Sequence, residues 1–310
     1  MPTEKLSHRI TLRDANLLTM IDRHPFTANQ LLRVSKTFPE PFTQDRLLRR
    51  RLGQLRTARM VQDFPSATIR EGGAPHYWKL TREGHHLVHG YDETLPSRRQ
   101  FEAIAAGHHH HTLCLREFLT KVIVAAHAEG IRIDHFASEN SVCLEAGEFR
   151  MYPDCAFQLT HPDGRTFNFV IELDNSTERL RSRMDVESIE RKIRGYDAHQ
   201  SQFDALDPSR YVVLFITTRS DQRLQHILDL ASGLMQNPDR TVFLGVTLTE
   251  FVTTENPFRK AVIKDHRGLK RTLTPMPQSR LQHDGDDVKN TQRGSSQARP
   301  AQRTDAATVA

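Results

Sequence analysis

The sequence predicts an α+β protein of two domains, a small helical domain with a hairpin and then an α/β domain with a mixed central sheet. Leucines recur at helical spacing through residues 11–92, where two short strand-like segments flank Gly72-Gly73. From residue 108, helical stretches alternate with apolar strand-like runs such as Tyr211–Thr217. Apolar residues become scarce from Met276 onward. We therefore expect domains at 1–92 and 108–275, a linker at 93–107 and a disordered polar tail at 276–310.

The amino-acid composition indicates which class of protein this is. The chain has 310 residues, of which 37% are hydrophobic and 26% charged, as in soluble proteins. It contains no apolar run near the ~20 residues that span a bilayer, and its first residues lack a signal-peptide core. We expect a cytoplasmic location without membrane contact. The net charge of +5 is moderate, so the placement of charge matters more than its sum. The cysteines, Cys114, Cys143 and Cys155, fit reduced thiols rather than a disulfide framework.

Three helices are expected before the hairpin of the first domain. Leu12–Ile21 is amphipathic, Thr27 begins a short helix through Val34, and Thr43 begins a longer one. The core stripe of the longer helix is predicted to comprise Leu47, Leu48, Leu52 and Leu55. Its arginines are Arg46, Arg49, Arg50, Arg51 and Arg56, and Asp45 is its one acidic residue.

Two strands, 60–64 and 76–80, are expected to follow as a hairpin, with another helix opening at Thr81. The phrase Tyr77–Gly84 is similar to the ending "Y-x-L-T-x-x-G" of the wing in winged helix-turn-helix domains. That resemblance implies an arginine-lined helix in the major groove of DNA. Its candidate DNA-binding residues are Arg46, Arg49, Arg50, Arg56 and Lys79. A solvated arginine face and a protein-docking module remain open as alternatives.

The second domain is predicted from alternating elements. A helix from His108 to Ala128 precedes strands at about 131–138, 141–145, 153–160 and 166–174. A helix at about 183–203, a strand at 211–217, a helix at 224–235 and a strand at 241–246 follow. A last hairpin is expected within 260–273.

The strand at 166–174 carries the main candidate site. Because side chains alternate along a strand, Glu172 and Asp174 share one face of an otherwise apolar strand. Buried charge is costly without a partner. Lys192 lies on a helical stripe with core-type residues and is placed to reach back to these carboxylates. With Asp154 at the start of the preceding strand, the sequence predicts oxygen ligands for Mg²⁺ (Asp154, Glu172, Asp174) and a lysine beside a phosphate.

The predicted order of elements, with Pro153-Asp154 and then Glu172-Leu173-Asp174, resembles the PD-(D/E)xK nuclease-like fold. That motif expects a lysine where this chain has Asp174, and some branches move the lysine to the next helix, where Lys192 lies. A closer resemblance is to the replication-relaxation family of plasmid proteins. It rests on His111-Thr112-Leu113, Pro153-Asp154, Ile171–Asp174, and Lys192 with Tyr196.

This resemblance spans about 10–250 and implies a role in plasmid replication, DNA relaxation or mobilisation, with double-stranded DNA as the partner. It does not by itself imply cleavage. As an enzyme, the protein would hydrolyse phosphodiester bonds, with Asp154, Glu172 and Asp174 holding Mg²⁺, Lys192 stabilising negative charge and Glu117 assisting. The alternatives are a catalytically inactive DNA-binding regulator or replication accessory protein, whose acids form structural ion pairs, and a protein-interaction module.

Other conspicuous residues are given structural interpretations. The run His108–His111 is expected to begin a helix or pack, rather than bind metal, because only His108 and His111 share a face. Tyr196 is interpreted as a core aromatic with a wet hydroxyl rather than a nucleophile. Two interpretations, a DNA groove and a salt-bridged solvated helix, stay open for Arg179, Arg181, Arg183, Arg191 and Arg194. For the tail, weak DNA attraction and solubilisation also stay open.

Overall fold

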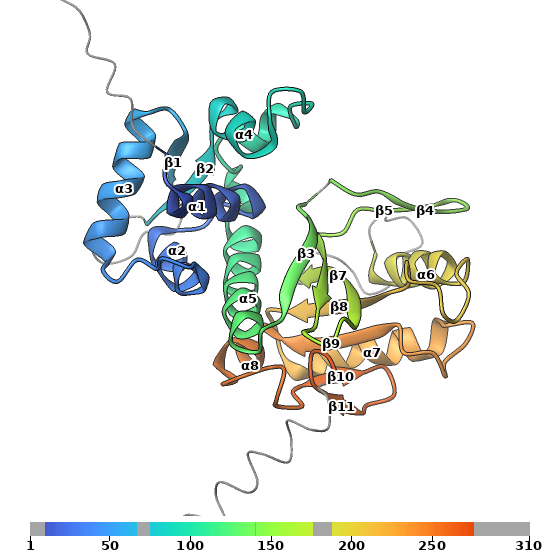
Figure 1. Ribbon diagram of the computed structural model, residues 1–310. Coiled ribbons are helices and arrows are strands. Elements are labelled where there is room, and N and C mark those ends of the chain that lie inside the picture. Colours follow the sequence, from blue (N-terminus) through green and yellow to red (C-terminus); the bar gives the residue numbers. More distant parts are fainter. Residues whose placement is uncertain (1–9, 67–74, 140, 176–187, 276–310) are drawn as a thin grey trace, which may run out of the picture. The chain divides into compact units, whose positions relative to one another are not determined.

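A computed structural model describes residues 10–66, 75–139, 141–175 and 188–275 (Figure 1). The described residues up to Thr274 form one compact unit. The chain is a mixed α/β protein with a seven-stranded mixed sheet, as the sequence predicts. The predicted tail at 276–310 and the Gly72-Gly73 loop lie outside the described residues.

The N-terminal elements form largely where the sequence predicts them. They are α1 (Leu12–Arg23), α2 (Ala28–Val34), the 3₁₀ turn Ser35–Thr37, α3 (Asp45–Thr57), β1 (Val61–Pro65), β2 (His76–Leu80) and α4 (Arg82–His89). Thr27 caps α2 as predicted, and Gln30 Oε1 in turn accepts a hydrogen bond from Thr27 N at 2.9 Å. The predicted cap at Thr43 is wrong, because α3 begins after Gln44 and has no side-chain cap.

The core stripe of α3 is narrower than predicted. Leu48, Leu52 and Leu55 are buried, whereas Leu47 is exposed. Successive helical residues are about 100° apart, so a face centred on Leu48, Leu52 and Leu55 turns Leu47 toward solvent. Arg51 on the same helix bonds the buried Asp14 of α1, with Nε 2.6 Å from Oδ1. This ion pair fixes α3 against α1.

The motif Tyr77–Gly84 has a physical basis at the junction of β2 and α4. The Thr81 hydroxyl accepts a hydrogen bond from Gly84 N and donates one to the carbonyl of Arg59. A Cβ at Gly84 would lie 2.0 Å from the Met60 carbonyl oxygen. Glycine is therefore required where α4 crosses the start of β1.

The predicted linker at 93–107 lies along the hairpin. It contains 3₁₀ turns at Arg98–Phe101 and Ala106–His108. Lys79 Nζ donates to the carbonyl oxygens of Arg99 (2.9 Å) and Glu102 (2.7 Å), and Ile104 N donates to Tyr77 Oη at 2.8 Å. This segment is thus attached to β2 by hydrogen bonds.

The main sheet follows α5 (His109–Ala128) and has the order β11-β10-β9-β8-β7-β6-β3. Its strands are β3 (Arg132–Ala137), β6 (Cys155–Thr160), β7 (Thr166–Asp174), β8 (Tyr211–Thr217), β9 (Phe243–Thr247), β10 (Ile263–Asp265) and β11 (Lys270–Arg271). Strands β7, β8 and β9 are parallel, joined through α6 (Ile189–Gln200) and α7 (Asp221–Leu234). The other pairs are antiparallel, including the predicted last hairpin β10-β11.

One expected strand differs. Residues 141–145 were predicted as a strand, but β4 is Leu144–Ala146 and pairs with β5 (Phe149–Met151) in a separate two-stranded sheet. Only three residues long, β4 makes its pairing locally with β5. The predicted helix at 183–203 begins as α6 at Ile189, after residues 176–187 that lie outside the described ranges.

The two faces of the main sheet are covered by different helices (Figure 1). Helices α6 and α7 pack on one face through a cluster that includes Val170, Ile193 and Ile227. Helices α5 and α8 (Leu248–Thr253) lie on the other, where the Phe118 and Phe251 rings are 4.8 Å apart. Within the described residues, no helix is long and apolar enough to cross a membrane.

Candidate functional site

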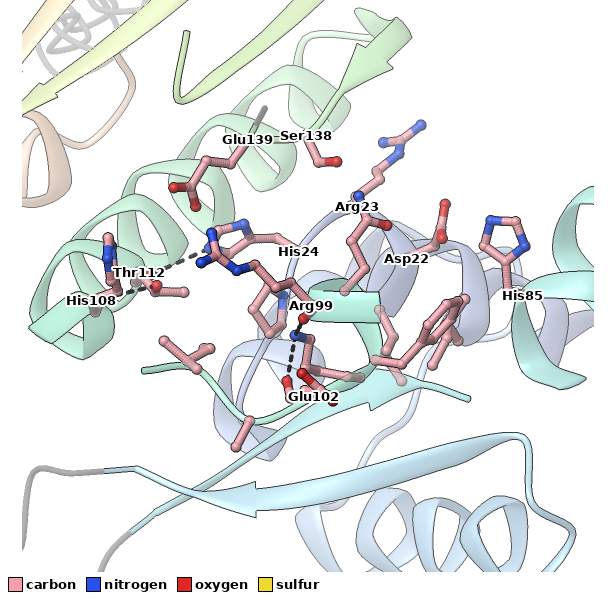
Figure 2. A pocket seen from close by; sticks show the side chains of 18 of the residues that line it. Asp22, Arg23, His24, His85, Arg99, Glu102, His108, Thr112, Ser138 and Glu139 are labelled. Carbon is pink, nitrogen blue, oxygen red and sulfur yellow. Dashed lines mark hydrogen bonds between the residues drawn. The ribbon is translucent and has the colours of Figure 1, made fainter. Parts of the chain in front are cut away.

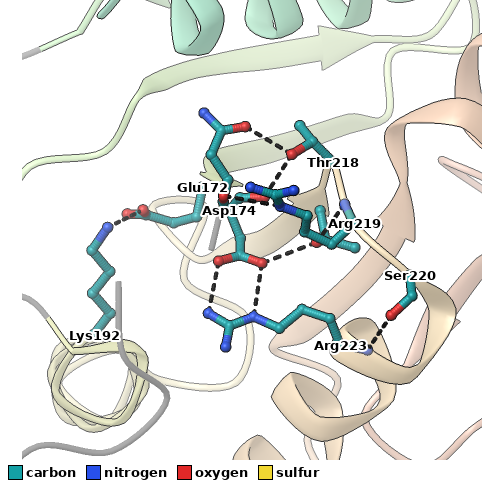
Figure 3. Close-up of polar contacts among 9 residues, drawn as sticks. Glu172, Asp174, Lys192, Thr218, Arg219, Ser220 and Arg223 are labelled. Atoms are coloured by element: carbon teal, nitrogen blue, oxygen red, sulfur yellow. Dashed lines mark hydrogen bonds and ion pairs between the residues drawn. The ribbon is translucent and has the colours of Figure 1, made fainter. Parts of the chain in front are cut away.

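The two acids of β7 share the sheet face that α6 and α7 cover, as strand alternation predicts. Both are buried, with Glu172 2% exposed and Asp174 5% exposed. Figure 3 shows that their carboxylates turn to different partners, Glu172 toward Lys192 and Asp174 toward Arg223. The two acids therefore belong to separate interactions.

Glu172 is bound by two side chains of α6. Lys192 Nζ lies 2.8 Å from Oε2, and the Tyr196 hydroxyl donates to Oε1. Lys192 and Tyr196 are four residues apart, so both face the same strand. Burial raises the pKa of Glu172 to about 7, although Lys192 opposes the shift. Lys192 thus reaches back to a β7 carboxylate, as the sequence predicts, while Tyr196 is fully buried and its hydroxyl meets Glu172 rather than water.

Asp174 is held by α7 and β8. Arg223 donates through Nε to Oδ2 (3.0 Å) and through Nη2 to Oδ1 (2.9 Å), and Thr217 Oγ1 donates to Oδ2 at 2.9 Å. Asp174 lies two residues, or about 7 Å, further along β7 than Glu172. At this position its carboxylate contacts α7 instead of α6. The structure does not bring Asp174 together with Glu172 and Asp154 as the predicted metal set requires.

Asp154 lies directly before β6 and is tied to β7. Its Oδ2 accepts a hydrogen bond from Leu173 N at 2.6 Å, so the carboxylate sits beside the peptide that follows Glu172. Its Oδ1 lies 2.9 Å from His111 Nε2, in the first turn of α5. The Asp154 side chain keeps 14% of its surface exposed, more than Glu172 or Asp174.

His111 and Glu139 complete a cluster around Asp154. Each of these three residues offers a ligand atom, and those atoms all lie within 4.8 Å of one another. Asn175 Nδ2 lies 3.3 Å from His111 Nδ1. Burial disfavours charge on His111, but the Asp154 carboxylate more than offsets this and raises the pKa of His111.

The donor set decides which cation fits. Mg²⁺ prefers oxygen ligands alone, whereas an imidazole with two carboxylates suits Mn²⁺, Fe²⁺ or Zn²⁺. Among the described residues, Asp154, Glu172 and Asp174 do not form a group whose ligand atoms lie close together, and Glu172 and Asp174 instead bind Lys192 and Arg223. Asp154, His111 and Glu139 do converge and fit a divalent cation that accepts nitrogen.

Two of these residues were missed by sequence reasoning. His111 was assigned to helix start or packing with the rest of its run, although the phrase His111-Thr112-Leu113 already marked it in the family resemblance. Glu139 gave no signal, because it follows β3 without a motif around it.

Other predicted residues have other contacts. Glu117 bonds Gln30 Nε2 (2.7 Å) and Arg33 Nη1 (3.0 Å) of α2 rather than joining the site. Arg194 pairs with Glu190 on the same helix, and Arg191 donates to the Glu148 carbonyl. Arg179, Arg181 and Arg183 lie outside the described residues.

The predicted DNA-binding residues divide into paired and unpaired side chains. Arg49 pairs with Asp45, Arg56 pairs with Asp63, and Lys79 is bonded to carbonyl oxygens of the segment that follows α4. Burial lowers the pKa of Lys79 to about 8. Arg46 and Arg50 are exposed and make no ion pair within the described ranges, so they are the cations of α3 that are open to a partner.

The described residues thus form a mixed α/β protein in which His111, Glu139 and Asp154 converge, and in which Lys192 of α6 pairs with Glu172 of β7. The sequence matches the replication-relaxation family over residues 18–205, well over half of the chain, and the protein belongs to that family. His111, Asp154, Glu172 and Lys192 all lie within the matched region. Membership suggests a role in plasmid or mobile-element replication or relaxation. No curated protein and no solved structure matches the sequence significantly.

Proposed function

We propose that this protein binds double-stranded DNA in the replication, relaxation or mobilisation of a plasmid or mobile element. In this proposal α1–α3 and the β1-β2 hairpin form a winged helix-turn-helix, with α3 as the recognition helix. Family membership and the exposed Arg46 and Arg50 on α3 support it. An arginine-bearing helix of this kind meets phosphates and guanine edges in the major groove.

DNA binding is tested by the salt dependence of affinity. Arg46→Ala with Arg50→Ala is expected to weaken binding and to lower the slope of log K against log salt by about 2, one for each lost phosphate contact. Arg132→Ala with Arg165→Ala is the matched control, because it removes two exposed positive charges far from α3, one on β3 and one in the β6-β7 turn. Equal slopes for the two double variants would contradict the assignment of α3.

The second part of the proposal is metal-dependent phosphodiester hydrolysis in a nuclease-like domain formed by α5 and the main sheet. The observation that carries it is the placement of Asp154, bonded to the peptide after Glu172 and beside His111 and Glu139. Asp154, His111 and Glu139 would hold a divalent cation, which when bound activates water and stabilises charge on the phosphate.

The chain's own residues would prepare the site. Leu173 N fixes the orientation of Asp154, and Asn175 fixes that of His111. The Lys192 ammonium, 22% exposed, compensates Glu172 and contributes positive charge to a phosphate that approaches Asp154. Mg²⁺ stays a candidate cofactor, although the histidine favours Mn²⁺.

A regulator without catalysis is the second candidate. It is favoured by the internal partners of Glu172 and Asp174, which are typical of structural ion pairs. Calorimetric titration with Mn²⁺ separates the two candidates at the binding step. The enzyme proposal requires binding that Asp154→Asn abolishes and that Asp163→Asn, at the exposed β6-β7 turn, leaves unchanged.

A further inference from the structure

A second cluster of metal-type ligands lies between α1 and α4. Asp22 is near the end of α1, and His85 and His89 are one turn apart on α4, so both histidines face the same way. One ligand atom from each residue lies within 4.8 Å of the other two. The His85 and His89 ring centroids are 4.4 Å apart, and His89 Nε2 is 2.8 Å from Asp22 Oδ2.

The ion pair between Asp22 and His89 explains the positions of these two side chains but not the burial of His85 beside them. His85 is 7% exposed, and its buried Nδ1 has no hydrogen-bond partner among the described residues. A buried polar atom without a partner is unfavourable, because it has lost its hydrogen bonds to water and gained none in the protein. A bound cation gives all three residues a common role, because it joins both imidazoles and the carboxylate.

The cluster is accessible from a cavity. Asp22 and His85 line one end of a space of about 410 Å³, which extends to Glu139 and His108 at its other end (Figure 2). A hydrated ion can therefore reach the cluster without unfolding α4.

We propose that Asp22, His85 and His89 bind a first-row transition-metal ion, best matched by Zn²⁺. Two imidazole nitrogens and one carboxylate oxygen leave a fourth tetrahedral position for water. The ion links α4 to α1, and α4 follows directly from β2. Its binding therefore stabilises the same N-terminal elements that present α3, without using any α3 residue.

The test isolates this cluster from the one at Asp154. In an Asp154→Asn background, the full chain is titrated with Zn²⁺ in competition with a chromophoric chelator, and with Co²⁺ by absorption spectroscopy. We expect one equivalent of Zn²⁺, a tetrahedral Co²⁺ spectrum and a raised thermal midpoint. His89→Gln is expected to weaken binding by more than about 100-fold, beyond the usual effect of losing an outer-shell partner. His86→Gln, on the same helix outside the cluster, is expected to bind like the parent.

His89 is the residue to replace because its side chain is 37% exposed, so the variant leaves no buried gap. Circular dichroism confirms that the variants fold. The proposal is overturned if the Asp154→Asn protein binds no Zn²⁺, or if His89→Gln binds as tightly as its parent. Neither result bears on DNA binding, which is measured through Arg46 and Arg50.

Discussion

Breaking the ion pair between Asp174 and Arg223 tests whether Asp174 is a structural ion-pair partner or a metal ligand. Asp174 is 1% exposed at its side chain and Arg223 is 16% exposed. Arg223→Met removes the hydrogen bonds that the guanidinium donates to Asp174, while the carboxylate stays buried. Breaking one side of a buried pair costs about 3–5 kcal/mol, because the remaining charge loses its compensation.

The assay is thermal and urea unfolding of the full chain without added metal. For a unit of this size a loss of 3 kcal/mol lowers the thermal midpoint by roughly 6–12 °C. Asp174→Asn combined with Arg223→Met also removes the buried negative charge and is expected to recover about 2 kcal/mol of the loss. Arg194→Met, which breaks the exposed pair with Glu190, is the control and is expected to cost about 0.5 kcal/mol or less.

The reasoning is refuted if Arg223→Met is as stable as Arg194→Met, or if the double variant is no more stable than Arg223→Met alone. Either result would mean that Arg223 is not what compensates Asp174. A metal role for Asp174 would then regain support.

Three further predictions concern other buried groups. Burial holds the pKa of His24 at about 3, so the unfolded chain takes up the proton first and stability falls as pH drops below about 6.5. In urea unfolding, the free energy of unfolding of the wild type should fall by about 2 kcal/mol more than that of His24→Asn between pH 7 and pH 5. Equal falls for the two proteins would contradict this. Gly84→Ala should cost roughly 1–3 kcal/mol through its clash with Met60, whereas Gly53→Ala, with open space, should not destabilise. Lys192→Met should raise the pKa of Glu172 above about 7 in a carbon-detected NMR titration, and an unchanged value would show that Lys192 does not compensate it.

Sequence reasoning predicted the parts of this structure that depend on local periodicity. Strand alternation placed Glu172 and Asp174 on one face, and the helical stripe of α6 placed Lys192 within reach of Glu172. The phrase Tyr77–Gly84 marked a real junction, where Thr81 caps α4 and only glycine fits at position 84. In each case the decisive contacts lie within one element or between neighbouring elements.

The partners chosen by the tertiary fold were not predictable in the same way. Alternation gives the face of Asp174 but not its partner, and Arg223 lies 49 residues later on another helix. Glu139 and Asp154 meet only because β3 pairs with β6. His111 was obscured by its neighbours, since it was interpreted together with the run of four histidines and given a helix-start or packing role.

The central claim, that Asp154 anchors a metal-dependent site acting on DNA, is tested most directly by a nicking and cleavage assay. Supercoiled and linear DNA are incubated with wild type, Asp154→Asn, Lys192→Met and the Asp163→Asn control, with Mg²⁺ or Mn²⁺. We predict metal-dependent cutting by wild type and Asp163→Asn that is lost in Asp154→Asn and strongly reduced in Lys192→Met. Wild-type protein that binds the DNA but leaves it intact with either metal, or cutting that persists in Asp154→Asn, would contradict the claim.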